Sequence, residues 1–205
     1  MQRARVDPER PAPRKLAPAI EALSRDQVIL YPSDTGYAFG CALSSRKAIG
    51  KIRMLKGHDE RSRKPLSMLV NALSNFGHYA IMETNVFRTV RRILPGAYTI
   101  VLEASTDVPR DMRNRFGEIG LRMPDSSLCR MLVEGIDEPI VTGSLTSGDD
   151  EAELEDPNEL ERIFGGRVEL IVDGGPMWPE PSTILHASGG ELEVTREGKG
   201  PLPER

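Results

Sequence analysis

The chain has 205 residues, of which 39% are hydrophobic and 28% charged, and its formal net charge is −4. This size and balance suit a soluble protein with a real core, built as one large α/β domain or two small ones. No apolar run is long enough to span a bilayer, and residues 1–15 lack the apolar centre of a secretory signal. We therefore expect a cytoplasmic protein that makes no use of a membrane.

Cysteine and histidine are too scattered to predict a metal site. Cys41 and Cys129 lie far apart without a C-x-x-C motif, and His58, His78 and His186 show no ligand spacing. Two unpaired cysteines suit a reducing compartment. We expect no metal held by protein ligands alone.

The N-terminal residues 1–18 contain five Lys/Arg and four prolines, which predicts a flexible arm followed by one domain over residues 19–205. After a short helix over 19–24, Val28–Tyr31 is an apolar run typical of a buried strand. Pro32–Gly36 is a turn rich in hydrogen-bonding side chains, and a second strand follows over 37–43.

The next segment is a basic helix that Ser44 or Ser45 caps and that buries an apolar stripe. Between Arg46 and Lys64 the chain carries eight Lys/Arg and two acids, although the whole chain is acidic. A local cationic patch beside the Pro32–Gly36 turn suits a phosphate-bearing ligand. The alternative is a solvated helix face, which is the commoner outcome for a run of charges.

Asp34-Thr35-Gly36 also matches the active-site loop of aspartic proteases. That chemistry needs two carboxylates that share a proton, and the chain has no second D-[ST]-G. A symmetric dimer would have to supply the second copy, so we set this interpretation aside.

The middle of the chain predicts strands over 65–70, 98–103 and 118–123, with helical segments over 71–82 and from Thr84 to Pro95. Arg122 lies among apolar neighbours in the third of these strands, where a charge is costly unless it meets an anion. The alternative, a strand-edge charge that points to water, stays open on the sequence pattern.

The last third predicts a helix over 128–133, capped by Ser126 and closed by Gly135, and a strand over 139–142. Residues 143–148 form a small-residue loop whose backbone N–H groups are able to approach phosphate. A helix from Asp156, a strand over 168–173 and a β-pair over 182–186 and 191–196 complete the pattern. The predicted fold is one α/β domain, a twisted mixed sheet flanked by helices.

Several short motifs then follow one another in a recognisable order. They are Tyr31–Tyr37 with Gly40, Lys56-Gly57, Lys64–Leu66, Pro95-Gly96 with Tyr98-Thr99, Gly120–Pro124, Ser144, Pro181–Ile184 and Arg196–Gly198. From about residue 19 to 200 the chain resembles the YrdC/YciO family, which contains the threonylcarbamoyl-AMP synthases that begin the threonylcarbamoyladenosine modification of tRNA.

The resemblance implies a YrdC-like domain with a basic concave cavity. It also implies a reaction that joins threonine, bicarbonate and ATP to give threonylcarbamoyl-AMP and pyrophosphate, with Mg²⁺ as the counter-ion of ATP. Lys56 would be the catalytic residue. The residues implied to bind threonine are Ser33, Thr35, Tyr37, Lys56 and Arg61, and those implied to bind the nucleotide are Arg122, Ser144, Ser182 and Arg196.

Two departures place the chain closer to the YciO branch. Synthases of the family usually carry Lys-x-Arg after the basic helix, and here His58 takes the place of the arginine. The usual T-S-A-N is Gly143–Thr146, so the asparagine is missing. The alternative function is therefore a nucleotide-binding protein, or one that binds double-stranded RNA or tRNA backbone, with weak or no synthase activity.

Overall fold

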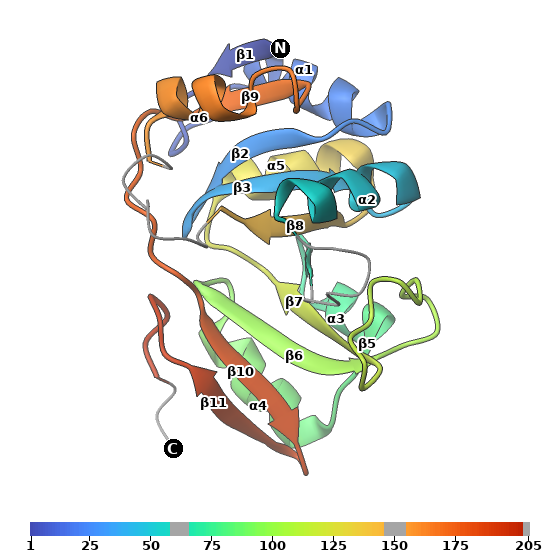
Figure 1. The fold of residues 1–205 in the computed structure, drawn as a ribbon. Helices are drawn as coiled ribbons and strands as arrows, with labels where there is room; N and C mark the ends of the chain where they lie inside the picture. Colours follow the sequence, from blue (N-terminus) through green and yellow to red (C-terminus); the bar gives the residue numbers. More distant parts are fainter. Residues whose placement is uncertain (58–65, 146–154, 203–205) are drawn as a thin grey trace.

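The computed structural model describes residues 1–57, 66–145 and 155–202, which form one mixed α/β unit around a single twisted sheet (Figure 1). The sheet runs in the order β1-β9-β2-β3-β8-β4-β7-β6-β10-β11, with β5 beside β6. The predicted fold class, a twisted mixed sheet flanked by helices, is confirmed.

The bounds of the elements follow the chain in order. The strands are β1 (Gln2–Arg5), β2 (Ile29–Ser33), β3 (Gly36–Ala42), β4 (Ser67–Leu69), β5 (Ala80–Ile81), β6 (Tyr98–Ala104), β7 (Glu118–Arg122), β8 (Ile140–Ser144), β9 (Leu170–Asp173), β10 (Thr183–Ser188) and β11 (Glu191–Arg196). The helices are α1 (Pro13–Ser24), α2 (Arg46–Leu55), α3 (Ser74–Tyr79), α4 (Thr84–Ile93), α5 (Ser127–Ile136) and α6 (Pro157–Phe164).

The hairpin of β2 and β3 carries the first motif to the middle of the molecule. Its strands pair from Ile29 with Gly40 to Ser33 with Gly36. Gly36 has a φ of +105°, which strains any residue with a side chain, and a Cβ there would lie 3.1 Å from the backbone of Pro179. The tight tip therefore allows the loop before β10 to cross directly over Thr35.

Helices cover the two faces of the sheet unequally. On one face, α2, α3, α4 and α6 pack on a core that extends from Leu30 on β2 to Leu185 on β10. On the other face, α1 and α5 pack on residues such as Tyr31 of β2 and Ile140 of β8, and this second core contains no residue of β6, β7 or β10 among the described parts of the chain. Because the sheet twists, α2 lies in front of the upper strands in Figure 1, whereas α3 and α4 lie behind the lower ones.

The uncovered part of that second face carries a different set of side chains. Along β6 and β7 the core residues Ile100 and Leu121 alternate with Thr99, Gly120 and Arg122. Alternate residues of a strand point to opposite faces, so the polar and small residues here face the side without a helix. This polar floor on one half of the sheet is covered by none of the helices in the described part of the chain.

Several predicted boundaries were wrong. Residues 1–18 are not a separate arm, because β1 pairs in parallel with β9 and α1 already begins at Pro13. Residues 80–81 pair with β6 instead of continuing a helix. The helix that Ser126 caps ends beyond Gly135, and Asp137 takes the left-handed conformation, with φ of +55°.

Other predicted elements agree closely with the structure. Ser45 caps α2 by accepting a hydrogen bond from the Ala48 N–H at 3.3 Å. The final β-pair is β10 with β11, which join antiparallel. Among the described residues, no helix combines the length and apolar character needed to cross a bilayer.

Candidate functional site

A cavity of about 350 Å³ lies over this polar floor of the sheet. Three cations and one carboxylate stand among its described lining residues, so its charge is mainly positive. The predicted site residues around it are Thr35, Lys56, Arg122, Ser144, Ser182 and Arg196. These residues come from the β2–β3 turn, the end of α2, β7, β8, the loop before β10 and the end of β11, so the fold gathers distant motifs into one space.

Arg122 is the most deeply placed cation of the cavity, since its exposed fraction is 5%. Its Nη2 donates to Asp34 Oδ1 at 2.8 Å and to Thr35 Oγ1 at 2.9 Å. The buried Nε of Arg122 and the buried Oδ2 of Asp34 have no hydrogen-bond partner. Burial raises the pKa of the Asp34 carboxyl, although the charges of Arg122 and Lys199 oppose the shift.

This geometry decides between the two interpretations of Arg122. A strand-edge charge that points to water is excluded by its burial and by its ion pair. Asp34 and Thr35 engage only the Nη2 of Arg122, whereas a guanidinium offers five N–H donors. Arg122 is therefore equipped to meet an anion from the cavity side.

Lys56 follows the last turn of α2 and reaches the cavity along β8. Its Nζ donates to the Ser144 carbonyl. The path is open because Gly143 has no side chain: a Cβ there would lie 2.8 Å from Lys56 Cδ. Gly143 and Ser144 thus position the ammonium group of Lys56. Both residues belong to β8 and not to the predicted loop.

Arg196 and Ser182 form the side of the cavity that the last hairpin supplies. Arg196 Nη2 donates to the Ser182 carbonyl at 2.7 Å, and Ser182 Oγ lies 2.8 Å from Thr99 Oγ1. Burial and the nearby charge of Arg122 lower the pKa of Arg196. A negative ligand between Arg196 and Arg122 would relieve this repulsion, so the pair favours an anion.

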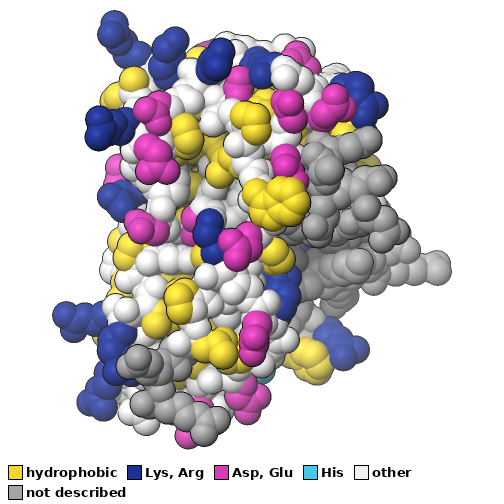
Figure 2. Space-filling model, turned by 90° about the vertical axis from the view of Figure 1, so that its left-hand side faces the viewer, with side chains coloured by type: hydrophobic (Ala, Val, Ile, Leu, Met, Phe, Trp, Pro, Cys, Tyr) yellow, Lys and Arg dark blue, Asp and Glu magenta, His cyan; other side chains and the backbone are white. Residues whose placement is uncertain are grey.

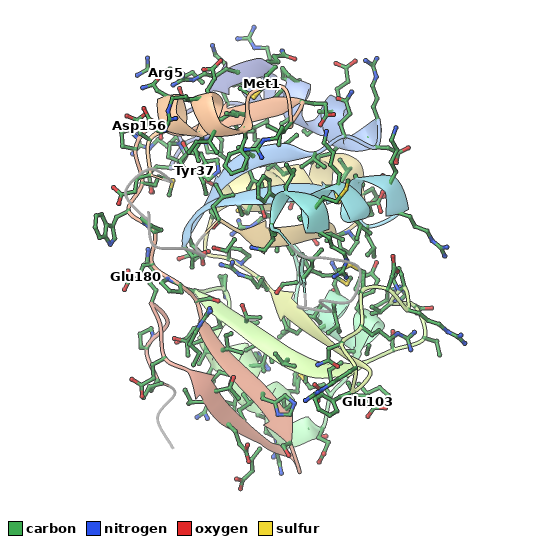
Figure 3. The ribbon with its side chains drawn as sticks, viewed as in Figure 1. Met1, Arg5, Tyr37, Glu103, Asp156 and Glu180 are labelled. Atoms are coloured by element: carbon green, nitrogen blue, oxygen red, sulfur yellow. The ribbon has the colours of Figure 1, made fainter. Side chains whose placement is uncertain are left out.

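Ser33 and Tyr37 were predicted to bind threonine, but neither residue lines this cavity. Ser33 Oγ donates to the Gly36 carbonyl at 2.8 Å and lies 3.1 Å from Thr35 Oγ1, so it shapes the hairpin tip. Tyr37, labelled in Figure 3, donates from its hydroxyl to the Gly175 carbonyl at 2.8 Å. Both residues hold neighbours in place, and the predicted residue Arg61 lies outside the described part of the chain.

Sequence reasoning missed three polar residues at the far end of the cavity. Glu118 accepts from Asn114 Nδ2 at 2.7 Å, and His186 Nε2 lies 2.6 Å from the other carboxylate oxygen of Glu118. Glu118 lies four residues before Arg122 on the same strand, so the period-2 pattern was the signal that both face the cavity. Among the described residues, no group of three His, Cys, Asp or Glu is arranged to hold a metal ion.

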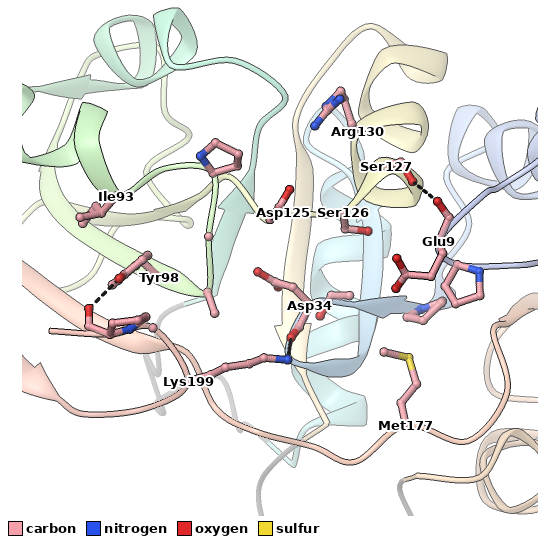
Figure 4. Close-up of a pocket in the computed structure, with 18 residues that line it drawn as sticks. Glu9, Asp34, Ile93, Tyr98, Asp125, Ser126, Ser127, Arg130, Met177 and Lys199 are labelled. Carbon is pink, nitrogen blue, oxygen red and sulfur yellow. Dashed lines mark hydrogen bonds between the residues drawn. The ribbon is translucent and has the colours of Figure 1, made fainter. Parts of the chain in front are cut away.

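A second, larger cavity of about 690 Å³ lies beyond Asp34 (Figure 4). Figure 4 shows Lys199 reaching Asp34, where its Nζ donates to the main-chain carbonyl at 2.7 Å. Glu9, Asp125 and Arg130 also line this space, so charges of both signs alternate around it. The first cavity holds six of the predicted site residues, whereas this one holds Ser33, and we take the first as the candidate site.

Comparison with known proteins agrees with this architecture. The family model of Sua5/YciO/YrdC proteins, described as "Telomere recombination", matches residues 21–198. Since the match covers most of the chain, the protein belongs to the Sua5/YciO/YrdC family.

Individual relatives place it within that family. It is 31% identical over 201 residues to an uncharacterized protein of Haemophilus influenzae, covering 95% of this chain and 94% of that one. The crystal structure of Escherichia coli YciO matches with a TM-score of 0.89 and 29% identity, over 98% of this chain and 97% of that one.

More distant relatives carry a named activity or ligand. The threonylcarbamoyl-AMP synthase of Bos taurus is 26% identical over 184 residues, which are 90% of this chain and 65% of the bovine protein. The crystal structure of P. abyssi Sua5 complexed with L-threonine has a TM-score of 0.83 at 22% identity, over 97% of this chain and 58% of that one.

Proposed function

We propose that the protein is a threonylcarbamoyl-AMP synthase-like enzyme that acts on threonine, bicarbonate and ATP and supplies tRNA modification. The observation that carries the proposal is the meeting of Lys56, Arg122 and Arg196 in one cavity. The activity named for the bovine relative and the L-threonine bound to Sua5 support the same substrates.

The proposed chemistry needs electrostatic stabilisation more than a protein nucleophile. The amino group of threonine bonds to the carbon of bicarbonate, and a C–O bond breaks with loss of water to give a carbamate. A carbamate oxygen then bonds to the α-phosphorus of ATP while the bond from that phosphorus to the bridging oxygen breaks and pyrophosphate leaves. Negative charge builds on the phosphate oxygens in the transition state. Arg122 and Arg196 are preplaced donors on one side of the cavity, and Lys56 is a third cation from α2.

Thr35 gives the amino-acid substrate a place beside this charge. Its hydroxyl accepts from Arg122 and lines the cavity. Holding three reactants in one enclosed space removes much of the entropic barrier to their reaction. We assign the carboxylate and hydroxyl of threonine to the Thr35–Lys56 side and the phosphates to the Arg122–Arg196 side.

Mg²⁺ enters this proposal with ATP. Among the described lining residues the single carboxylate is Glu118, which lies at the far end from Arg122. This set does not make a carboxylate cage, and it fits a Mg²⁺ ion held mainly by the phosphates and water.

The deciding experiment is a pyrophosphate-release assay with the full chain. We expect release from ATP only when threonine and bicarbonate are both present, and we expect it to fall at least about a hundredfold in Lys56→Ala, since preorganised donors of this kind contribute on that scale. Lys47→Ala is the matched control, because Lys47 is an exposed lysine of the same helix. Release that ignores threonine, or equal activity in both variants, would contradict the proposal.

The second candidate is binding of double-stranded RNA or tRNA backbone. Exposed arginines on α4 favour it, namely Arg88, Arg91 and Arg92. The face in Figure 2 weakens it, because Lys/Arg and Asp/Glu side chains are interspersed there, whereas backbone binding needs a continuous basic surface. RNA affinity that falls steeply with salt and is indifferent to threonine would favour this candidate over the enzyme.

A further inference from the structure

The floor of the candidate site has opposite charges at its two ends. Arg122 and Glu118 both face the cavity from β7 and are four residues apart, which corresponds to about 13 Å at about 3.3 Å per residue. Gly120 lies between them, and Val101 is its partner in register on β6. With Ile184 of β10 this middle zone is small and apolar. Its shape suits a flat ring or a sugar more than another charged group.

The polar end beyond this zone is held rigidly. Asn114 Oδ1 accepts from the main-chain N–H groups of Phe116 at 2.8 Å and Glu118 at 3.0 Å. The amide orientation of Asn114 is therefore fixed, and its Nδ2 faces the Glu118 carboxylate at 2.7 Å. His186 holds the other carboxylate oxygen at 2.6 Å. Burial opposes ionisation of Glu118, but these two partners outweigh it and lower its pKa.

The pair of Glu118 and Asn114 offers one acceptor beside one donor. Each oxygen of a carboxylate has two lone pairs, so Glu118 is able to accept another hydrogen bond. An amide nitrogen carries two hydrogens, and Glu118 uses one of those on Asn114. The amino group and the neighbouring ring nitrogen of adenine present the matching donor and acceptor, whereas hypoxanthine presents an oxo group and an N–H in the reverse order.

We propose that Glu118 and Asn114 read the amino edge of the nucleobase and make this site selective for an adenine nucleotide. The inference rests on the proposed function, because it takes the phosphates to lie at Arg122, Ser182 and Arg196. The apolar zone over Gly120 then receives the nucleoside, and the base ends at Glu118. His186 acts as a positioning residue for the carboxylate.

Equilibrium binding by calorimetry, with Mg²⁺ and without threonine, tests this proposal separately from catalysis. The wild-type chain is expected to bind ATP at least about tenfold more tightly than ITP or GTP, since a matched pair of this kind discriminates by one to three kcal/mol. In Glu118→Gln the new side-chain amide donates to the oxo group of hypoxanthine, so the ATP/ITP ratio is expected to fall to near one or to invert.

Glu103→Gln is the matched control. Glu103 is the register partner of Glu118 on β6, is exposed and is absent from the described cavity lining (Figure 3). Its substitution is expected to leave the ATP/ITP ratio unchanged. A gain of ITP affinity in Glu118→Gln would also show that the variant is folded.

The outcomes separate the two proposals. Equal affinity for ATP and ITP, tighter binding of GTP, or an unchanged ratio in Glu118→Gln overturns the role of Glu118 while leaving the synthase proposal standing. Failure of the chain to bind any of the three nucleotides overturns both. Selective ATP binding without threonine-dependent pyrophosphate release overturns the synthase proposal and supports the adenine site.

Discussion

Within the described residues, helices cover both faces of β2, β3 and β8 but only one face of β6, β7 and β10. In the covered half, both sets of alternating side chains are apolar, as Leu30 and Tyr31 illustrate on β2. In the open half, one set is apolar and the other contains Thr99, Gly120 and Arg122. Side chains alternate between the two faces in both halves of the sheet. The comparison therefore teaches that the site arises where the second layer of described helices ends.

The ion pair that joins the two halves gives the largest expected effect. Asp34→Ala leaves the Arg122 guanidinium buried without its carboxylate, and a broken buried pair of this kind costs about 3–5 kcal/mol. Urea unfolding followed by circular dichroism measures the loss. A loss below about 1 kcal/mol would show that the cavity already solvates Arg122.

The opposite truncation serves as its control. In Arg122→Met the remaining Asp34 is able to take up a proton, because burial raises its pKa and Arg122 no longer opposes the shift. A raised carboxyl pKa stabilises the folded state below the ordinary Asp value, and this stability is lost as pH rises through the raised pKa. The variant is therefore expected to lose less stability than Asp34→Ala in acid and to weaken toward neutral pH.

A pair of matched isoleucines sharpens the comparison of the two halves. Ile140 is fully buried in the core under α1 and α5, whereas Ile184 is half-buried and lines the cavity. Ile140→Ala is expected to cost about 2–5 kcal/mol in unfolding free energy, and Ile184→Ala about 1 kcal/mol or less. Equal costs would mean that the open half is as tightly packed as the covered one.

Gly143→Ala tests whether the absence of a side chain on β8 allows Lys56 to reach the cavity. The added methyl group would lie 2.8 Å from Lys56 Cδ and displace that side chain. We expect threonine-dependent pyrophosphate release to fall about tenfold, which is about 1.4 kcal/mol in the activation barrier. Unfolding is expected to change less than activity, and unchanged activity would place the action of Lys56 elsewhere.

Gly50→Ala gives the smallest expected effect, in the opposite direction. Gly50 lies within α2, and a Cβ there meets no atom within 4 Å. Replacing a helical glycine by alanine is expected to raise the free energy of unfolding by about 0.5–1 kcal/mol while leaving the site unchanged. Destabilisation would contradict the open space that the structure shows beside Gly50.

The sequence alone predicts those features that local patterns control. The β2–β3 hairpin, the Ser45 cap and the last β-pair were predicted because their signals lie within a few residues of one another. The place of residues 2–5 in the sheet was not, because Arg3 meets its partner Asp173 across 170 residues of chain. Proline and arginine near the N-terminus favour an arm when that partner is unknown.

The residues of the candidate site also divide into those that local sequence patterns predict and those that only the structure shows. A cation among apolar residues pointed to Arg122, and the structure adds Asp34, which no local pattern joins to it. Ser33 and Tyr37 share a motif with Thr35 but do not line the cavity. Glu118 escaped notice because one acidic residue at the start of a strand carries no signal until Asn114 and His186 are placed beside it.

The parallel pairing of β1 with β9 has a consequence for protein synthesis. During translation the ribosome releases residues 2–5 long before residues 170–173 exist, so this edge of the sheet stays open until β9 has been made. Contacts between such distant segments slow folding and lengthen the time for which a nascent strand is exposed. Any peptide fused ahead of Gln2 should therefore be soluble and unstructured, so that residues 2–5 remain available to pair with β9.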